Sequence, residues 1–236
     1  MEKILAQPTD IDILFIDDNS PDGTGALAEE LSRKIPRVKV LHRKNKQGLG
    51  MAYSDGFRWA LDNGYDVILQ MDADLSHDPH EIPVFLRAIR EYDAVFGSRY
   101  FHGVRVYNWS FRRLMLSKFS NEFIRLVLGL PCTDTTTAYK CFRREVIASV
   151  DFGRFRGRQN AFLIELVDAT VKRGFKTKEI PFMFIERATG ESKMNWGVAW
   201  ESLATVFRLF VLGLVVRYPA RKKSSGNEIR VPLKVN

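Results

Sequence analysis

The sequence predicts an α/β fold in which a mostly parallel sheet carries helices on both faces. Between residues 11 and 97, short apolar runs alternate with segments of helical spacing in the order β-α-β-α-β-α-β. Two of the predicted strands end in acidic residues, Asp17 and Asp18 after one and Asp72 and Asp74 after the other. Because ligands of such sheets bind beyond the carboxyl ends of the strands, these acids lie at the predicted binding edge.

The predicted strands are short, apolar and rich in β-branched residues, and turn-forming residues follow them. They cover residues 11–16, 38–41, 66–71, 94–97 and 176–185. The predicted helices are marked by apolar residues three and four apart and by end signals such as Asp78 before Pro79. They cover residues 24–34, 48–63, 78–90, 109–128, 160–173 and 196–216. Polar loops are expected at residues 133–137 and 187–193.

The composition is that of a folded protein. The 236 residues are 45% hydrophobic and 27% charged, which argues against disorder. We expect one domain over residues 1–221 and a flexible basic tail over residues 222–236. Cys132 and Cys141 are too few for a disulfide framework, and we expect them to be reduced and packed in the core.

The formal net charge of +8 is compatible with nucleic acid, an anionic membrane or a phosphorylated substrate as partner, or with a basic solvated surface alone. Nucleic acid is disfavoured, because the sequence has no aromatic–basic motif and no helix-turn-helix. No apolar run reaches the ~18 to 20 residues of a membrane-spanning helix, and the first residues lack the pattern of a signal peptide. We therefore expect a cytoplasmic protein.

The pair Asp72 and Asp74 is the strongest candidate for a metal site. Side chains two apart on a strand point to the same side, so both carboxylates can reach one divalent cation at the strand end. Mg²⁺ or Mn²⁺ prefers such oxygen ligands and shares them with substrate phosphates. Two solvated loop acids are the alternative. A dinucleotide site is disfavoured, because no G-x-G-x-x-G opens a helix.

Seven segments carry a resemblance to a known family. They are IDDNSPDGT (16–24), NKQGLGMAYSDGF (45–57), MDADLSHDP (71–79), GSRYFHG (97–103), FRRLMLSKFSN (111–121), TDTTTAYKCFRREV (133–146) and FIERATGESKM (184–194). In this order they resemble the glycosyltransferase family 2 catalytic domain of the GT-A type, and more narrowly the dolichol-phosphate (polyprenyl-phosphate) mannosyltransferases. The first and third segments together are highly specific, whereas an Asp-x-Asp alone is not.

The resemblance implies a site for a nucleotide-sugar donor. Asp17 and Asp18 match positions that contact the base or ribose, although helix capping is an alternative for Asp18. Asp72 and Asp74 match the metal pair that bridges the donor diphosphate, with Asp74 counted as catalytic. The further donor positions implied are Gly48 and Gly50, which could equally serve turn geometry, and Arg187 and Lys193. Ser76 stands where many relatives carry a Gln near the metal, so the third ligand is left open.

The resemblance also implies a pocket for an acceptor phosphate, formed by Arg99, Arg113 and Ser117, with both arginines counted as catalytic. Two guanidinium groups and a hydroxyl suit a phosphate, and helical i, i+4 spacing brings Arg113 and Ser117 to one face. Asp134 matches a loop acid to which no role is assigned, and Glu165 is expected either to face the site from its helix or to be a surface acid. The histidines His77 and His80 are expected at a helix entry rather than as ligands.

The activity implied is metal-dependent, inverting transfer of mannose from GDP-mannose to a polyprenyl (dolichyl) phosphate. One alternative is a glucosyl or other sugar transferase with the same acceptor, and another is a truncated, non-catalytic paralogue that acts as a binding partner. The segment 203–216 is expected to be either a buried core helix or an interfacial helix beside the lipid, with basic residues at 217–223 facing anionic headgroups. We expect peripheral contact with the cytoplasmic face of a membrane.

The family also begins with a strand and a Pro-x-Tyr-Asn-Glu motif, and neither precedes residue 11 here. In the GT-A sheet that strand lies between those predicted at residues 11–16 and 66–71. We therefore expect the sheet to lack its first strand, so that these two strands have no partner between them.

Overall fold

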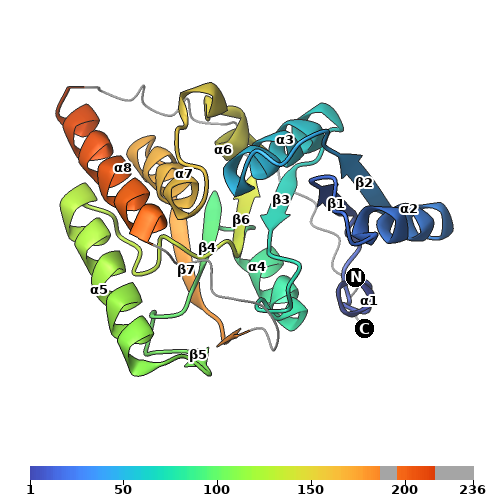
Figure 1. Ribbon diagram of the computed structural model, residues 1–236, viewed down its shortest axis with the longest axis horizontal. Helices are drawn as coiled ribbons and strands as arrows, with labels where there is room; N and C mark the ends of the chain where they lie inside the picture. Colours follow the sequence, from blue (N-terminus) through green and yellow to red (C-terminus); the bar gives the residue numbers. More distant parts are fainter. Residues whose placement is uncertain (187–195, 216–236) are drawn as a thin grey trace.

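The computed structural model describes residues 1–186 and 196–215, and its centre is a four-stranded sheet in the order β3-β6-β4-β7 (Figure 1). The strands are β1 (Ile13–Asp17), β2 (Val38–His42), β3 (Val67–Gln70), β4 (Ala94–Ser98), β5 (Val106–Tyr107), β6 (Lys140–Arg143), β7 (Thr177–Pro181) and β8 (Phe184–Ile185). Two smaller parallel pairs, β1 with β2 and β5 with β8, flank the central sheet.

Most of the described helices lie within predicted helical segments, but the helix at Arg144–Ala148 was not predicted and the one at Ile82–Ala88 is shorter than the predicted 78–90. The helices are α1 (Glu2–Leu5), α2 (Thr24–Lys34), α3 (Leu49–Asp62), α4 (Ile82–Ala88), α5 (Phe111–Leu128), α6 (Arg144–Ala148), α7 (Asn160–Lys172) and α8 (Trp196–Val215), with short 3₁₀ turns at Pro79–Glu81 and Phe152–Arg154. Asp78 accepts a hydrogen bond from the His80 N–H at 3.0 Å, so the predicted cap is present, on the 3₁₀ turn that leads into α4. Gly129, in the left-handed conformation, ends α5.

Apolar side chains cover both faces of the central sheet. On β4, Ala94 and Phe96 enter a core formed mainly with α3, α6, α7 and α8, whereas Val95 enters a second core formed with α4. This alternation follows from the two-residue period of a strand. The predicted α/β architecture with helices on both faces is confirmed.

Strand β6 makes the sheet mixed rather than mostly parallel. It pairs antiparallel with both β3 and β4, while β4 pairs parallel with β7. The sequence analysis assigned no strand here. It also predicted one strand over residues 176–185, where the structure has β7 and β8 in two different sheets. The division falls after Pro181, which has no N–H to continue a ladder.

The strands β1 and β3 belong to different sheets. In the described part of the chain, β1 pairs with β2 and β3 pairs with β6, and no strand joins β1 to β3. This agrees with the expectation that these two strands lack a partner between them. The loops after β1, β3 and β4 carry four of the predicted site residues, Asp18, Asp72, Asp74 and Arg99.

Candidate functional site

The acidic loop that carries Asp72 and Asp74 leaves β3 after Gln70. Tyr53 of α3 donates its hydroxyl to Asp72 Oδ1 at 2.8 Å, and Ser76 donates its N–H and its hydroxyl to Asp74 Oδ1, at 3.1 and 2.5 Å. Burial, reinforced by the Asp72 charge, raises the pKa of Tyr53 well above its ordinary value, so Tyr53 remains a neutral donor. The two carboxylates lie in a loop after the strand, and hydroxyl groups orient them. The prediction that strand alternation points both to the same side is therefore wrong.

His77 joins this loop to the loop that carries Thr137. The backbone N–H of Asp72 donates to His77 Nδ1 at 3.0 Å, and Nε2 lies 3.5 Å from Thr137 Oγ1. The ring stacks on Tyr139 with 4.9 Å between centroids. Burial lowers the pKa of His77, which keeps the ring neutral and Nδ1 able to accept. The sequence analysis placed His77 at a helix entry and missed this contact with the acidic loop.

The acidic loop fits a divalent cation that is shared with a substrate. Asp72 and Asp74 are both partly exposed and offer carboxylate oxygens, the ligand type that Mg²⁺ and Mn²⁺ prefer. Ser76, left open as a third ligand, is buried and hydrogen-bonded to Asp74. Within residues 1–186 and 196–215, no three His, Cys, Asp or Glu side chains gather closely enough to hold a metal by themselves. Substrate phosphates and water can supply further oxygen ligands.

Asp17 is the last residue of β1 and Asp18 follows it, and each has a basic partner. Asp17 is buried and accepts from the Ser20 N–H at 3.2 Å, while His42 Nδ1 lies 3.3 Å from its other oxygen. Burial alone would raise the pKa of Asp17, but the contacts with Ser20 and His42 outweigh it and lower the pKa. Asp18 forms an ion pair with the buried Arg43.

Arg43 is a residue of this site that the sequence analysis missed. Its Nε donates to Asp55 Oδ2 at 2.8 Å while Nη1 engages Asp18, so one guanidinium joins the loop after β1 to α3. The sequence signal that could have indicated this role is the position of Arg43, a basic residue directly after β2. The Arg43 charge offsets that of Asp18, which leaves Asp18 oriented next to a pocket.

That pocket has a volume of about 310 Å³ and a mixed charge. Its lining residues are Asp18, Asn19, Ser20, Pro21, Lys44, Asn45 and Lys46.

The neighbouring Gly48 has φ +94°, and a Cβ there would lie 3.2 Å from the Arg158 carbonyl oxygen. A Cβ on Gly50 would lie 2.8 Å from the Gly157 carbonyl oxygen. Both glycines are therefore required by close backbone packing, and their contact with a donor stays a prediction.

Arg99 and Asp134 form a buried pair beyond the end of β4. Arg99 donates from Nε and Nη2 to the two carboxylate oxygens at 2.7 and 2.8 Å, and Nη2 also reaches Thr136 Oγ1 at 2.8 Å. Burial alone would raise the pKa of Asp134, but the Arg99 guanidinium holds it below its usual range. Asp134, to which the sequence analysis assigned no role, therefore orients Arg99.

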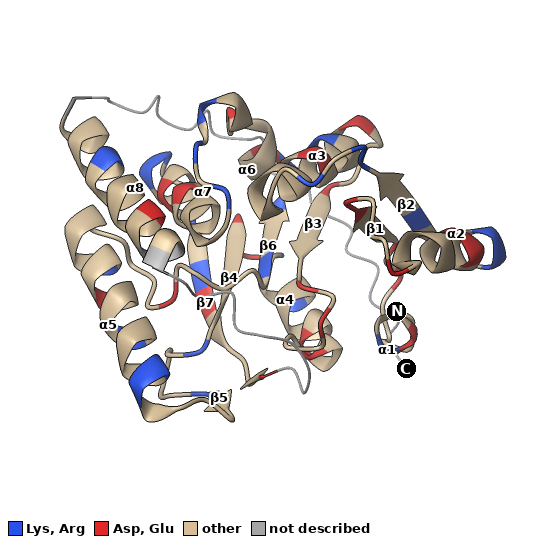
Figure 2. Ribbon diagram, viewed as in Figure 1, with Lys and Arg blue, Asp and Glu red and all other residues tan. Residues whose placement is uncertain are grey.

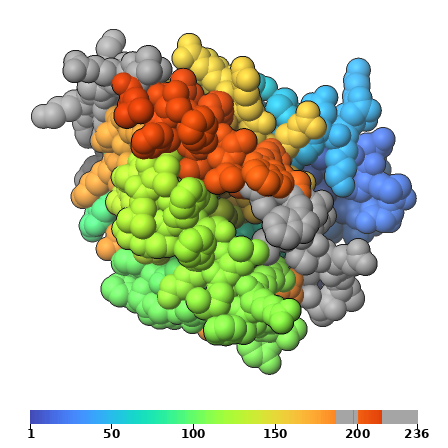
Figure 3. All heavy atoms as spheres, turned by 60° about the vertical axis from the view of Figure 1, so that its left-hand side comes forward, coloured from blue at the N-terminus to red at the C-terminus, as the bar shows by residue number. Residues whose placement is uncertain are grey.

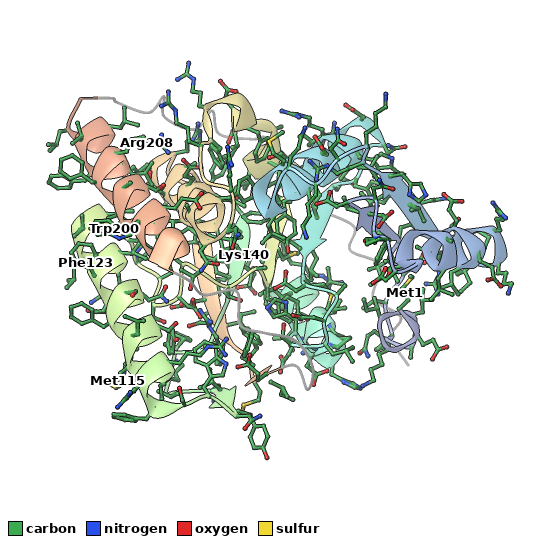
Figure 4. All side chains as sticks on the ribbon, in the orientation of Figure 1. Met1, Met115, Phe123, Lys140, Trp200 and Arg208 are labelled. Carbon is green, nitrogen blue, oxygen red and sulfur yellow. The ribbon has the colours of Figure 1, made fainter. Side chains whose placement is uncertain are left out.

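Three buried side chains fix the loop that carries Asp134. Glu179 of β7 accepts from the N–H of Asp134 at 3.0 Å. Asn121 of α5 accepts from the Thr135 N–H at 2.8 Å and donates to Thr136 Oγ1 at 3.1 Å. Lys140 of β6, in the middle of the molecule, donates to the carbonyl oxygens of Thr135 and Thr137 (Figure 4). The other predicted polar loop, at residues 187–193, lies outside the described residues.

Arg113 and Ser117 lie on the first turns of α5. Arg113 forms an ion pair with Glu186, directly after β8. Tyr100, next to Arg99, donates its hydroxyl to Ser117 Oγ at 2.7 Å, which leaves the Ser117 proton for another acceptor. Burial raises the pKa of Tyr100, so Tyr100 stays protonated. Contacts through Tyr100 and Trp109 thus bring together the three predicted acceptor residues, Arg99, Arg113 and Ser117.

Next to these residues, α5 and α8 pack against each other and lie side by side on one face of the molecule (Figure 3). Together they expose an apolar surface. Its large exposed side chains are Phe111, Met115, Leu116, Phe119, Phe123 and Leu126 on α5, and Trp200, Leu203, Phe207, Phe210, Val211 and Leu214 on α8. We call this set the α5/α8 apolar face. An apolar groove of about 440 Å³ runs between the helices, and Phe123 and Trp200 both line it.

One side of helix α8 is in the core and the other is exposed, so the interfacial role of the segment 203–216 stays a prediction. Val206 and Leu209 enter the core, whereas Leu203 and Phe207 are exposed. Its two charged residues are Glu201 and Arg208 (Figure 2). None of the helices in the described ranges has the length and hydrophobicity needed to cross a membrane.

A family model described as "Glycosyl transferase family 2" matches residues 1–150 of the chain. The chain belongs to glycosyltransferase family 2. This confirms the resemblance on which the predicted site rests.

Within family 2, the chain is similar to transferases that act on lipid phosphates. It is 40% identical over 215 residues to the undecaprenyl-phosphate mannosyltransferase of Micrococcus luteus, covering 91% of this chain and 87% of that protein. It is 43% identical to the polyprenol monophosphomannose synthase of Mycolicibacterium smegmatis, covering 88% of this chain and 79% of that protein. It is 37% identical to the dolichol-phosphate mannosyltransferase of Pyrococcus furiosus, covering 86% of this chain and 56% of that protein.

Solved structures support the GT-A fold of this family 2 chain. Glucosyl-3-phosphoglycerate synthase of Mycobacterium tuberculosis, in complex with Mn²⁺, UDP and phosphoglyceric acid, aligns with a TM-score of 0.60 and 14% identity. That alignment covers 84% of this chain and 67% of the other. Another structure of the same enzyme aligns over 94% of this chain and 78% of the other, with a TM-score of 0.56 and 13% identity.

The remaining predicted residues of this glycosyltransferase are structural or lie outside the described part. Glu165 is buried in α7, accepts from the Arg156 and Gly157 N–H groups and pairs with Arg208, so it ties α8 to α7. The exposed His80 contacts Asp78 at the entry to α4, as expected. The two cysteines, Cys132 and Cys141, are free and buried in the core. Arg187 and Lys193 lie outside the described residues, as does the predicted tail over residues 222–236.

Proposed function

We propose that this chain transfers mannose from GDP-mannose to a polyprenyl (dolichyl) phosphate, with inversion and with Mg²⁺ or Mn²⁺. The observation that carries the proposal is the position of Arg113 and Ser117 on α5, the helix that also forms the α5/α8 apolar face. A lipid phosphate has an anionic headgroup and an apolar chain. An anion-binding site next to an apolar surface matches both parts. The names of the similar proteins point to the same substrate class.

On this proposal, the donor diphosphate lies beside the acidic loop. Asp72 and Asp74 would hold the metal, which offsets the charge that develops on the departing diphosphate. Asp17 and Asp18 would accept hydrogen bonds from the base or ribose. Tyr53 and Ser76 would hold the carboxylates and His77 would hold the Asp72 backbone, without moving a proton.

Arg99, Arg113 and Ser117 would hold the acceptor phosphate as the nucleophile. A phosphate oxygen forms a bond to the anomeric carbon, while the bond from that carbon to the donor diphosphate breaks and GDP leaves with the electron pair. One displacement inverts the anomeric centre. The acceptor phosphate is already ionised near neutral pH, so no side chain has to act as a general base. Arg113 would exchange its ion pair with Glu186 for the acceptor.

The lipid chain would follow the α5/α8 apolar face, and the enzyme would contact the cytoplasmic side of a membrane peripherally. Exposed aromatic and aliphatic side chains at such density suit insertion into the headgroup boundary. The basic residues at 217–223, outside the described part, would add attraction to anionic lipids.

A transfer assay tests the proposal. Purified protein is incubated with radiolabelled GDP-mannose, a short polyprenyl phosphate and Mg²⁺ or Mn²⁺, and label is counted in the organic phase. We expect label that disappears with EDTA and falls at least a hundredfold in Asp74→Asn. Asp62→Asn, at the exposed end of α3, is the matched control and should retain full transfer. Absence of label would contradict the mannosyl proposal, and label from GDP-glucose or UDP-sugars instead would identify a different sugar transferase.

A further inference from the structure

Trp109 lies between β5 and α5 and touches both predicted phosphate-binding arginines. The Cζ atom of Arg113 is 4.2 Å from the centroid of the Trp109 ring, and the Cζ atom of Arg99 is 5.3 Å from it. Both distances are within the range of cation–π attraction. Arg99 also approaches Tyr100 and Phe184, at 5.3 and 5.6 Å, but Trp109 is in contact with both guanidinium groups.

The Trp109 ring is held by packing. Phe184 of β8 meets it edge to face, with 5.5 Å between ring centroids. The indole Nε1–H is buried and has no hydrogen-bond acceptor within the described part of the chain. A buried indole N–H normally finds an acceptor, and leaving it unpaired costs free energy. Among the described residues, the contacts with the two cations and with Phe184 are therefore the interactions that the ring makes.

The two arginines need such a support because each is tied to a different element. Asp134 in the loop after α5 holds Arg99, and Glu186 after β8 holds Arg113. When an anion replaces Glu186, Arg113 loses its carboxylate partner, and the Trp109 ring remains in contact with it. A guanidinium group can stay in contact with the face of an aromatic ring while its N–H groups donate to a phosphate.

We propose that Trp109 is a positioning residue that holds Arg99 and Arg113 as a pair for the acceptor's phosphate. This inference rests on the proposed function, since it assigns the two arginines to a phosphomonoester. It adds the Trp109 ring to that site and predicts that Trp109 affects the affinity for the acceptor and not the affinity for the donor.

A double-mutant cycle on acceptor binding tests the inference. The dissociation constant of a short prenyl phosphate is measured by calorimetry for wild type, Trp109→Leu, Arg113→Lys and the double variant. We expect Trp109→Leu to weaken binding about tenfold, from the loss of two cation–π contacts. In the Arg113→Lys background the same change should weaken binding only about threefold, because part of the effect acts through Arg113. A tenfold effect that is undiminished in that background, or no effect in wild type, would overturn the inference.

Further arms separate positioning from folding. Trp109→Phe keeps a ring and should bind the prenyl phosphate within about threefold of wild type, and GDP binding should be unchanged in both Trp109 variants. Trp59→Leu is the matched control, since Trp59 is also partly buried and stacks on Tyr65 at 5.6 Å, but lies on α3. Equal loss of prenyl phosphate and GDP affinity in Trp109→Leu would indicate a general structural defect and overturn the inference.

The failure of the proposed function gives a different result. A wild-type protein that binds prenyl phosphate or inorganic phosphate through Trp109 but transfers no sugar would contradict the transferase proposal and support the positioning role. A wild-type protein that binds neither anion would overturn the positioning role itself.

Discussion

Arg99 and Asp134 are joined by two side-chain hydrogen bonds, and Asp134 has no exposed surface. The Arg99 N–H also donates to the same carboxylate at 3.1 Å, so the acid fixes both the backbone and the side chain at the end of β4. Because Nε and Nη2 both donate to Asp134, the orientation in which the guanidinium group can meet a ligand is fixed. The position of a proposed substrate-binding cation thus depends on an acid that touches no substrate.

Replacing Asp134 by Asn should therefore damage both stability and acceptor binding. The change leaves the Arg99 charge buried without a counter-charge, which we expect to cost about 3 kcal/mol of unfolding free energy. Chemical denaturation and prenyl phosphate binding measure the two effects. Asp151→Asn is the control, because Asp151 forms an exposed pair with Arg154 and should change stability by less than about 0.5 kcal/mol. A wild-type acceptor affinity in Asp134→Asn would contradict the orienting role.

Arg43 should matter on the donor side of the site. Arg43→Met leaves Asp18 without a cation and leaves Asp55 with only its ion pair to Arg58, and we expect a loss of about 2 kcal/mol in stability and weaker GDP binding. Adding Asp18→Asn removes the acid that is left unpaired and should recover part of the stability. Arg37→Met, which breaks an exposed pair with Asp10, serves as the control. If the second substitution gives no recovery, the ion-pair explanation is wrong.

The sequence predicted those elements whose signals are local. The helices α2, α3, α5 and α7 begin and end within about two residues of their predicted bounds, because spacing and end signals lie within each segment. Strand β6 was missed, because it contains Lys140 and Arg143 and resembles a polar segment. Its position depends on pairing with Leu69 and Val95, far away in the chain. No local pattern carries that information.

The same distinction separates the predicted from the missed site residues. Asp72 and Asp74 stand out because an acidic pair after an apolar strand is visible in the sequence itself. The roles of His77, Asp134 and Trp109 depend on which side chains fold onto them from other elements. The sequence showed His77 and Asp134 only as members of matching segments, and Trp109 only as the first residue of a predicted helix. The structure supplies the contacts that give each one a function to test.

Lys140 should make stability depend on pH. Burial lowers the pKa of Lys140 from 10.5 to about 8. Between these values the unfolded chain binds a proton at this amine and the folded chain does not, so stability from this residue rises with pH across that window. Relative to Lys140→Met, the wild type should gain on the order of 3 kcal/mol between pH 8 and 10.5, measured by denaturation at a series of pH values. Lys39→Met, on the exposed side of β2, should follow the wild-type profile, and a parallel course for Lys140→Met would refute the assignment.

The α5/α8 apolar face should bind membranes through its most exposed side chains. Phe119 and Phe207 are 71% and 70% exposed, so replacing either by Ser removes little packing and should leave the unfolding free energy nearly unchanged. Each replacement should weaken binding to vesicles of phosphatidylcholine and phosphatidylglycerol about fivefold, since a partly inserted phenyl ring contributes roughly 1 kcal/mol. Co-sedimentation with the vesicles measures this effect. Leu27→Ser is the control, because Leu27 is 58% exposed on α2, outside this face. If Leu27→Ser weakens binding as much as the two phenylalanine variants, the apolar face is not the membrane contact.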